Sequence, residues 1–468
     1  MYCQTDSTFL EFEKEFNNFN VKIDKEFIDF RDKSNQEFAA FLKQSWSKFY
    51  VESPIEKPID DKPITPTKFI PNKGVTPKDT VLEPLKVIIE KEDEKEEKPS
   101  AFEDSVNQKS LTGELIDILF YGTTFQFRFE KQKQIFCKGI LEQDVSTFWS
   151  EISKTDYQIY IQDFINYKAR FSLNDWALYE LVVRLSQKLY SDKSSLIAFQ
   201  FFCLNQLGYD AKVARADQSL VLLLNMKNEV FGISYIKITD KFYYIMNSNS
   251  NKGIYTFSSS FNKQLYPIDL KITKSITCFE NVKTRTIRFG DKPYVFSIDY
   301  SPELVDFYNN LPLTDFPVFF NSTISNITHQ SLIKNIKPLI VGKTEMEAVA
   351  FLLSFVQNGF EYKTDAGQFG KEKYFFVEDI LHYPFSDCED RSVFFSHLVK
   401  DLLGLEVIGL LYENHIATAV RFNQSVSGDA IHFDGNSYVV CDPTYIGAFA
   451  GMSMPQYEGV RPTIIKID

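Results

Sequence analysis

The chain has 468 residues, of which 63 are acidic and 51 basic, and its formal net charge at pH 7 is −12. This acidic balance argues against nucleic acid as the main binding partner, and no apolar run approaches the length of a transmembrane segment. Six irregularly spaced cysteines without a Cys-x-x-Cys pair indicate neither a disulfide framework nor a zinc site.

The first eight residues contain neither the basic region nor the apolar region of a signal peptide. We therefore expect a cytoplasmic protein, or a periplasmic or otherwise exported one if a leader preceded the chain. The length is sufficient for about three domains. The 45 phenylalanines indicate large, aromatic-rich cores.

Residues 1–50 are dominated by a long predicted helix, from about residue 9 to residue 50, with an aromatic repeat of 11 residues. Phe16, Phe27, Phe38 and Phe49 define the repeat. It corresponds to about 3.67 residues per turn, which keeps one apolar stripe along a nearly straight helix. We expect this stripe to pack against the protein's own globular body. Self-association through the helix is the alternative.

Residues 51–104 have the composition of a linker. Seven prolines between Pro54 and Pro84 are followed by a charged run from Glu90 to Lys98. Such a segment cannot bury enough apolar surface to fold alone. We predict an extended tether whose only role is spacing.

The region of residues 105–254 mixes predicted helices and strands. Apolar residues at helical spacing predict helices over residues 174–189 and 196–207. Alternating or β-branched runs predict strands over residues 123–129, 134–139, 211–216, 219–226, 235–238 and 242–245. Residues 255–333 are predicted to be a connector with further strands, at residues 284–289, 294–299 and 318–321.

Residues 334–468 begin with a helix predicted over residues 344–358. Pro384 then precedes a capping-box pattern, Ser386-x-x-Glu389, which predicts a helix with Ser386 as its N-cap and its end near Leu403. Strands are predicted over residues 405–412, 415–422 and 437–442. Two-residue turns at Glu413-Asn414 and Asp434-Gly435 introduce the second and third of these strands.

Three residues in this last region have the order and setting of a thiol-based catalytic triad. Cys388 is expected to be the second residue of the first helical turn, where free N–H groups and the helix dipole favour an anion. We therefore expect the thiol pKa to be lowered and an oxyanion to be stabilised there. His415 opens one predicted strand and Asp442 closes the next, so antiparallel pairing brings base and orienting carboxylate together. Asp390 is expected to buttress the start of the helix.

These features resemble the transglutaminase-like superfamily of cysteine enzymes, in its bacterial form. The resemblance covers about residues 335–457. Besides the triad, it rests on Phe355-Val356-Gln357, Phe360-x-Tyr362-x-x-Asp365, the run from Asp387 to Ser392, and Asp442-Pro443-Thr444-Tyr445. It implies an α+β fold, in which a cysteine begins a helix packed on an antiparallel sheet, and it implies that Cys388, His415 and Asp442 are the catalytic residues.

A shift of 196 residues places the predicted elements of residues 105–254 on those of residues 334–468, without a gap over about 55 positions. This indicates a duplicated domain. Asp192, Ser219 and Met246 then stand where the second copy has its triad, so we expect the first copy to be a non-catalytic pseudo-domain. It also lacks residues 363–385, which are predicted to form the lip of the cleft in the second copy.

The expected function is thiol-dependent acyl transfer on a peptide or protein amide. We expect a hydrolase, with water as the acceptor, ahead of a cross-linking enzyme. No metal or organic cofactor is implied, and the expected partner is the peptide or protein substrate. Tyr445 and Gln368 are candidates for lining the cleft or for donating to the oxyanion. A non-catalytic peptide-binding or scaffold protein is the main alternative. A calcium-gated cross-linking enzyme is disfavoured because no EF-hand loop is present.

Overall fold

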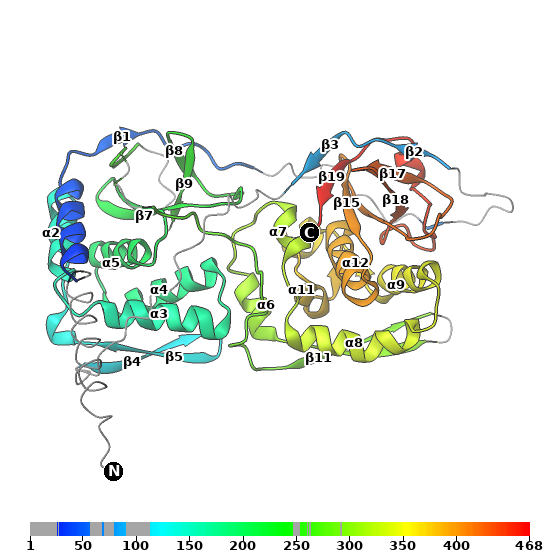
Figure 1. Cartoon of the computed structure of the whole chain (residues 1–468), viewed down its shortest axis with the longest axis horizontal. Coiled ribbons are helices and arrows are strands. Elements are labelled where there is room, and N and C mark those ends of the chain that lie inside the picture. Colours follow the sequence, from blue (N-terminus) through cyan, green and yellow to red (C-terminus); the bar gives the residue numbers. More distant parts are fainter. Residues whose placement is uncertain are drawn as a thin grey trace, which may run out of the picture.

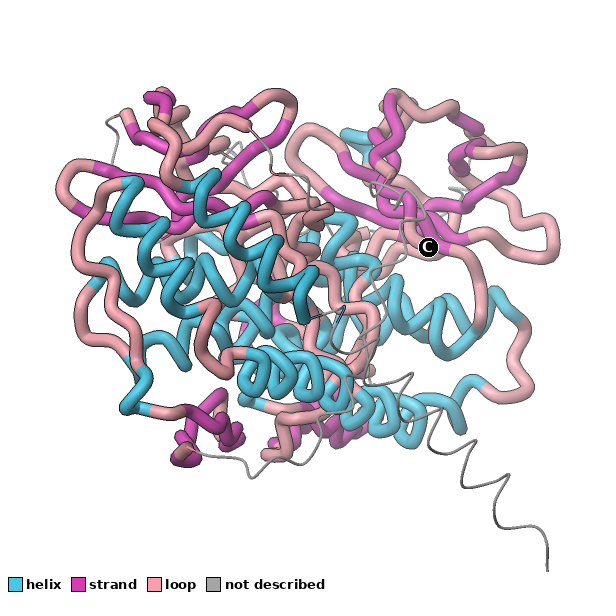
Figure 2. The backbone as a smooth tube through the Cα atoms, turned by 60° about the vertical axis from the view of Figure 1, so that its left-hand side comes forward, coloured by secondary structure: helices cyan, strands magenta, loops and turns pink. Residues whose placement is uncertain are grey.

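The computed structural model describes residues 26, 28–56, 68–69, 79–89, 113–246, 253–259, 261, 264–290 and 293–468. The described chain has two halves that lie side by side, each with a mainly antiparallel sheet packed on helices (Figure 1). In both halves the helices lie between the sheet and a two-stranded hairpin (Figure 2). The predicted α+β class is confirmed. No helix within the described residues has the length and apolar composition needed to cross a membrane.

The N-terminal helix is shorter than predicted at its C-terminal end. Residues 28–42 are helical, and the chain then enters strand β1 (Ser47–Phe49), where Phe49 pairs with Ile254. Phe38 is buried, and its ring centroid lies 4.5 Å from that of Trp149. Packing of the stripe on the protein's own body is therefore confirmed at Phe38, whereas Phe30 is 71% exposed. The start of the aromatic repeat lies outside the described residues.

The first half begins with a hairpin and four helices, followed by a sheet. Its elements are β4 (Glu114–Phe120), β5 (Thr123–Phe129), η1 (Lys131–Lys133), α2 (Glu142–Ile152), α3 (Gln158–Phe171), α4 (Asp175–Leu189), α5 (Lys193–Gln206), β6 (Ala211–Ala216), β7 (Ser219–Asn225), β8 (Tyr235–Ile238), β9 (Lys241–Met246) and β10 (Ile254–Thr256). The strand order in the sheet is β1-β10-β6-β7-β9-β8. The strand predicted at residues 134–139 is wrong, because Cys137 donates its N–H to the Ser195 hydroxyl instead of to a neighbouring strand.

The second half follows a similar plan. Its elements are β11 (Lys283–Phe289), β12 (Tyr294–Tyr300), α6 (Pro302–Tyr308), α7 (Phe316–Asn321), α8 (Asn326–Ile340), α9 (Glu345–Gly359), β13 (Glu361–Tyr362), α10 (Asp365–Phe369), α11 (Val377–His382), β14 (Phe385–Ser386), α12 (Cys388–Leu403), β15 (Val407–Leu411), β16 (Ile416–Val420), β17 (Ala430–Phe433), β18 (Asn436–Cys441), η2 (Pro455–Tyr457) and β19 (Thr463–Lys466). The strand predicted at residues 318–321 is wrong. These residues lie in α7, whose first turn contains Pro317, and a short buried helix has the same apolar run as a buried strand.

Two short strands of the predicted linker close the second sheet. Strand β2 (Val81–Leu82) pairs with β17, and β3 (Lys86–Ile88) pairs with β19, at opposite ends of the order β2-β17-β18-β16-β15-β19-β3. Only three residues separate β2 from β3, and three residues span about 10 Å. The two edges of the sheet must therefore approach one another, which makes the sheet barrel-like. The prediction that the whole linker only provides spacing is wrong for these residues.

The two sheets share a strand order. The order β10-β6-β7-β9-β8 in the first half matches β19-β15-β16-β18-β17 in the second. Val213 pairs with Leu222, and Gly409 pairs with Thr418, which agrees with the 196-residue shift.

The next hairpin does not keep the same shift. Met246 lies opposite Leu222, whereas Cys441 lies opposite Thr418, so this hairpin is shifted by 195 residues. The gapless alignment is therefore wrong by one residue. Met246 corresponds to Cys441, and the counterpart of Asp442 lies outside the described residues.

Candidate active site

Helix α12 begins one residue later than predicted. Asp387 is the N-cap, and Cys388 is the first helical residue. The Asp390 carboxylate accepts a hydrogen bond from the Asp387 N–H at 3.2 Å, so the predicted role of Asp390 at the helix start is confirmed. Ser386, the predicted N-cap, instead accepts from the Nε of Arg391 at 3.3 Å.

His415 and Asp442 meet at the ends of neighbouring strands, as predicted. His415 precedes β16, Asp442 follows β18, and these strands pair antiparallel. The Nε2 of His415 donates to the Oδ2 of Asp442 at 2.8 Å, and both side chains are buried. The other oxygen, Oδ1, accepts from the backbone N–H groups of Thr444 (2.8 Å) and Tyr445 (3.2 Å).

The bond to Asp442 sets the tautomer of His415. A carboxylate only accepts hydrogen bonds, so Nε2 carries the hydrogen and Nδ1 is left as an acceptor in the neutral ring. Among the described residues, Nδ1 has no hydrogen-bond partner. It is therefore available to accept a proton.

Other residues hold this pair, and the sequence did not point to a role for them. The rings of Tyr412 and Tyr457 lie nearly parallel to the His415 imidazole, at centroid distances of 6.4 and 5.3 Å. Gln357 on α9 donates to the backbone oxygens of Asp442 (3.0 Å) and Tyr445 (2.8 Å). The motif containing Gln357 contributed to the resemblance. Its hydrogen bonds, however, join residues about 90 positions apart, and the sequence pattern does not show such contacts.

The thiol of Cys388 does not have the predicted pKa. The side chain is 7% exposed, and Sγ contacts the Oε2 of Glu389 at 3.0 Å. Burial, and after it the Glu389 carboxylate, raises the pKa of the Cys388 thiol well above its ordinary value. The predicted lowering by the helix N-terminus is therefore wrong, because desolvation and a neighbouring negative charge both favour the neutral thiol.

Three buried carboxylates next to the thiol are positioned to hold a divalent cation. Ligand oxygens of Asp365, Asp387 and Glu389 all lie within 4.8 Å of one another. Within the described chain, Oδ1 of Asp387 has no hydrogen-bond partner. Burial and the charge of Glu389 raise the pKa of Asp365 to about 8. Carboxylate oxygens are the ligands that calcium and magnesium prefer, so this donor set fits such an ion.

Cys388 and His415 open onto one cleft with a volume of about 410 Å3. Its wall comes from both halves and from strand β3. The remaining lining residues are Lys86, Ile88, Glu229, Phe231, Asp315, Phe316, Pro317, Tyr374, Glu389, Leu411, Tyr412, Glu413 and Ile416. Of the predicted lip, residues 363–385, Tyr374 is the one residue that lines the cleft. Neither Tyr445 nor Gln368 lines it.

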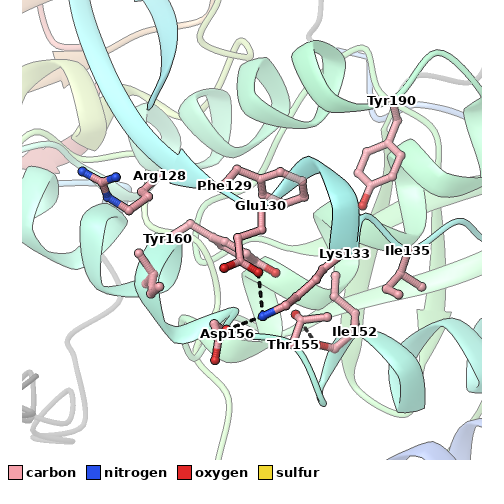
Figure 3. Close-up of a pocket in the computed structure, with 11 residues that line it drawn as sticks. Arg128, Phe129, Glu130, Lys133, Ile135, Ile152, Thr155, Asp156, Tyr160 and Tyr190 are labelled. Carbon is pink, nitrogen blue, oxygen red and sulfur yellow. Dashed lines mark hydrogen bonds and ion pairs between the residues drawn. The ribbon is translucent and has the colours of Figure 1, made fainter. Parts of the chain in front are cut away.

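Two other hollows in the first half are much smaller. The pocket in Figure 3 has a volume of about 30 Å3, close to that of one water molecule, and Lys133 bridges Glu130 and Asp156 at its rim. A second cavity beside Lys212 has a volume of about 90 Å3. The cleft at Cys388 is thus the one of the three with room for a peptide.

Comparisons with protein-family models, with curated proteins and with solved structures find no match to this chain. The geometry around Cys388 is therefore the basis for any function assigned to the protein.

Proposed function

We propose that the chain is a thiol-dependent acyl-transfer enzyme of the transglutaminase-like type, acting on peptide or protein amides through Cys388, His415 and Asp442. The observation that carries the proposal is the shared cleft. Cys388 and His415 both line it, and the bond from His415 to Asp442 leaves the imidazole Nδ1 as an acceptor.

The raised pKa of Cys388 determines how the first step proceeds. The resting nucleophile is a neutral thiol, so Sγ turns from Glu389 towards His415, and Nδ1 takes its proton as sulfur attacks the amide carbonyl. Free N–H groups at the start of α12 stabilise the oxyanion. His415 then returns the proton to the leaving amine, and a thioester to Cys388 is formed. We place hydrolysis of this thioester ahead of transfer to an amine, since water needs no binding site of its own.

We also propose that the two halves derive from one duplicated domain. The shared strand order and the hairpin of two seven-residue strands that begins each half support this. In the first half the corresponding helix starts with the N-cap Asp192 and then Lys193, and Ser219 stands at the position of His415, so neither a thiol nor an imidazole is present there. It acts as a non-catalytic partner of the second half.

The test is acylation of Cys388 by para-nitrophenyl acetate. The release of nitrophenol gives the rate, and peptide mapping identifies the acetylated residue. We expect an acetyl group on Cys388 and a rate about 100-fold lower in His415→Ala, because a general base typically contributes that much or more. Cys441→Ser removes a buried thiol outside the cleft and is the matched control. Equal rates at Cys388 in the wild type and His415→Ala would overturn the proposal.

A non-catalytic peptide-binding module is the second candidate. The contact between Cys388 and Glu389 favours it, since that contact holds the thiol in its neutral, weakly nucleophilic form. The same experiment separates the two candidates. A binding module would show slow acylation that does not depend on His415.

A further inference from the structure

The cleft at Cys388 has an excess of negative charge. Carboxylates of Glu229, Asp315, Glu389 and Glu413 line it, and Lys86 is the one lysine or arginine among the lining residues. Glu229 follows β7, and Glu413 lies in the turn between β15 and β16, so the charge comes from both halves. The potential in such a cleft favours a cationic ligand, because low-dielectric walls concentrate the field.

Glu229 and Glu413 are available to a ligand. Both side chains are exposed, and neither makes a hydrogen bond or ion pair with another residue in the part of the chain that the structure describes. An unpaired carboxylate at the rim of a cleft gains most from a basic side chain that approaches from solvent. These two residues are therefore the ones whose charge a substrate can use.

The rest of the wall is apolar and largely aromatic. Phe231, Phe316, Tyr374 and Tyr412 line the cleft. Tyr374 is buried, and its ring stacks on that of Phe316 with centroids 4.4 Å apart and an interplanar angle of 27°. A rigid aromatic wall accepts a bulky apolar side chain, and its faces also attract a guanidinium or ammonium group.

We propose that the cleft selects a polypeptide segment in which a lysine or arginine lies beside a bulky apolar residue. The volume of about 410 Å3 lies in the range of sites that hold such side chains. Glu229 and Phe231 give the first half a role as one wall of the site. That this segment is the substrate acylating Cys388 rests on the proposed function, whereas the charge preference rests on the lining residues.

The test uses thiol reagents that differ in charge, because they report the potential at Cys388 without a known substrate. A thiolate attacks a methanethiosulfonate at sulfur, forming a mixed disulfide and releasing methanesulfinate. Rates at Cys388 are measured by peptide mapping with a cationic trimethylammonium-ethyl, an anionic sulfonatoethyl and a neutral methyl reagent. The same three rates for a free thiol give the reference ratios.

We expect the cationic reagent to react about tenfold faster than the anionic one, after correction for the free thiol, at low ionic strength. The double variant Glu229→Gln and Glu413→Gln lowers this preference several-fold. The matched control is Asp240→Asn with Asp434→Asn, which removes one exposed turn carboxylate from each half outside the cleft and leaves the preference unchanged. Thermal melting checks that both double variants are folded.

A peptide experiment tests the substrate class directly. Peptide thioesters with Phe next to Lys, Gln or Glu are compared as substrates that acylate Cys388. We expect kcat/KM to be highest for the Lys peptide and lowest for the Glu peptide, and the three values to become similar in the double variant Glu229→Gln and Glu413→Gln. A wild-type cation preference that persists unchanged in this variant, or a flat peptide series, overturns the inference. Failure of the proposed function is distinguishable, because it is seen as an absent effect of His415→Ala on the neutral para-nitrophenyl acetate.

Discussion

Tyr457 lies parallel to the imidazole of His415, with ring centroids 5.3 Å apart and an interplanar angle of 15°. Asp442 holds one edge of the same imidazole through Nε2. The face and the edge of the ring are thus fixed by two different segments, the short helix η2 and the residue that follows β18. This arrangement restricts rotation of the ring and keeps Nδ1 in one place.

The stack predicts that Tyr457 positions the base. Tyr457→Ala should lower the rate of Cys388 acylation about tenfold, because a loosened imidazole spends less time in the reactive orientation. Tyr457→Phe retains the ring and should stay close to the wild-type rate. Acylation by para-nitrophenyl acetate measures both, with melting temperature as the control. An Ala variant that acylates normally would show that the stack serves only packing.

The contact between Glu389 and Cys388 predicts a pH effect of known sign. Burial and the Glu389 carboxylate raise the thiol pKa, so Glu389→Gln removes one cause and lowers that pKa. The pH profile of iodoacetamide alkylation at Cys388 should therefore move to lower pH. Asp434→Asn, which removes an exposed turn carboxylate outside the cleft, is the control. A profile that stays in place or moves upward in Glu389→Gln contradicts the assignment.

The sequence was most informative where local signals agree with the fold. Strands β6 and β8 and helix α4 have the predicted bounds to within one residue, because strand alternation and the Asn174 N-cap are local features. The meeting of His415 and Asp442 followed from the ends of two paired strands. Helix α7 has a start signal in Pro317, but its six residues are too few to show a helical period, which is why the apolar run was predicted as a strand.

Long-range contacts account for what the sequence did not indicate. Strands β2 and β3 contain only two and three residues in a region rich in proline and charge, and pairing with β17 and β19 alone makes them strands. The raised pKa of Cys388 likewise depends on burial that follows from packing of the whole second half. A local rule about helix N-termini could not anticipate it.

Gln357 is expected to matter for stability as well as for the site. It is buried, donates to the backbone oxygens of Asp442 and Tyr445, and accepts from the N–H of Gly447 at 3.1 Å. Gln357→Leu removes these bonds and leaves the Gly447 N–H without its acceptor, whereas the Asp442 and Tyr445 oxygens keep the backbone N–H groups of Tyr445 and Ala448. The loss should be about 3 kcal/mol, since a buried unsatisfied group costs about 1–3 kcal/mol and the lost hydrogen bonds add to it. Urea unfolding measures the loss.

Asn358→Ala, on the exposed side of the same helix, is the matched control for Gln357→Leu and should change stability by less than about 0.5 kcal/mol. Acylation of Cys388 should also slow in Gln357→Leu, because the loop that carries Asp442 loses its anchor. Equal stability of the two variants would mean that other contacts hold this loop.

Glu180 on α4 predicts a pH dependence of stability far from the site. Burial raises the pKa of Glu180 to about 7, and the Tyr121 hydroxyl donates to it at 2.8 Å. The pKa of Glu180 in the folded protein exceeds the unfolded value of about 4.5. The contribution of Glu180 to stability is therefore fully present below pH 4.5 and is lost as pH rises through 7. The loss is up to about 3 kcal/mol.

Glu180→Gln stays neutral at every pH and should therefore be more stable than the wild type at pH 8 but not at pH 4. Tyr121→Phe removes a hydrogen bond that lowers the Glu180 pKa, so Glu180 should ionise at a higher pH in this variant. The pH-dependent loss of stability should therefore continue to a higher pH than in the wild type. Urea unfolding at several pH values between 4 and 9 measures all three proteins. A stability difference between Glu180→Gln and the wild type that is constant over this range would show that folding does not change the pKa of Glu180.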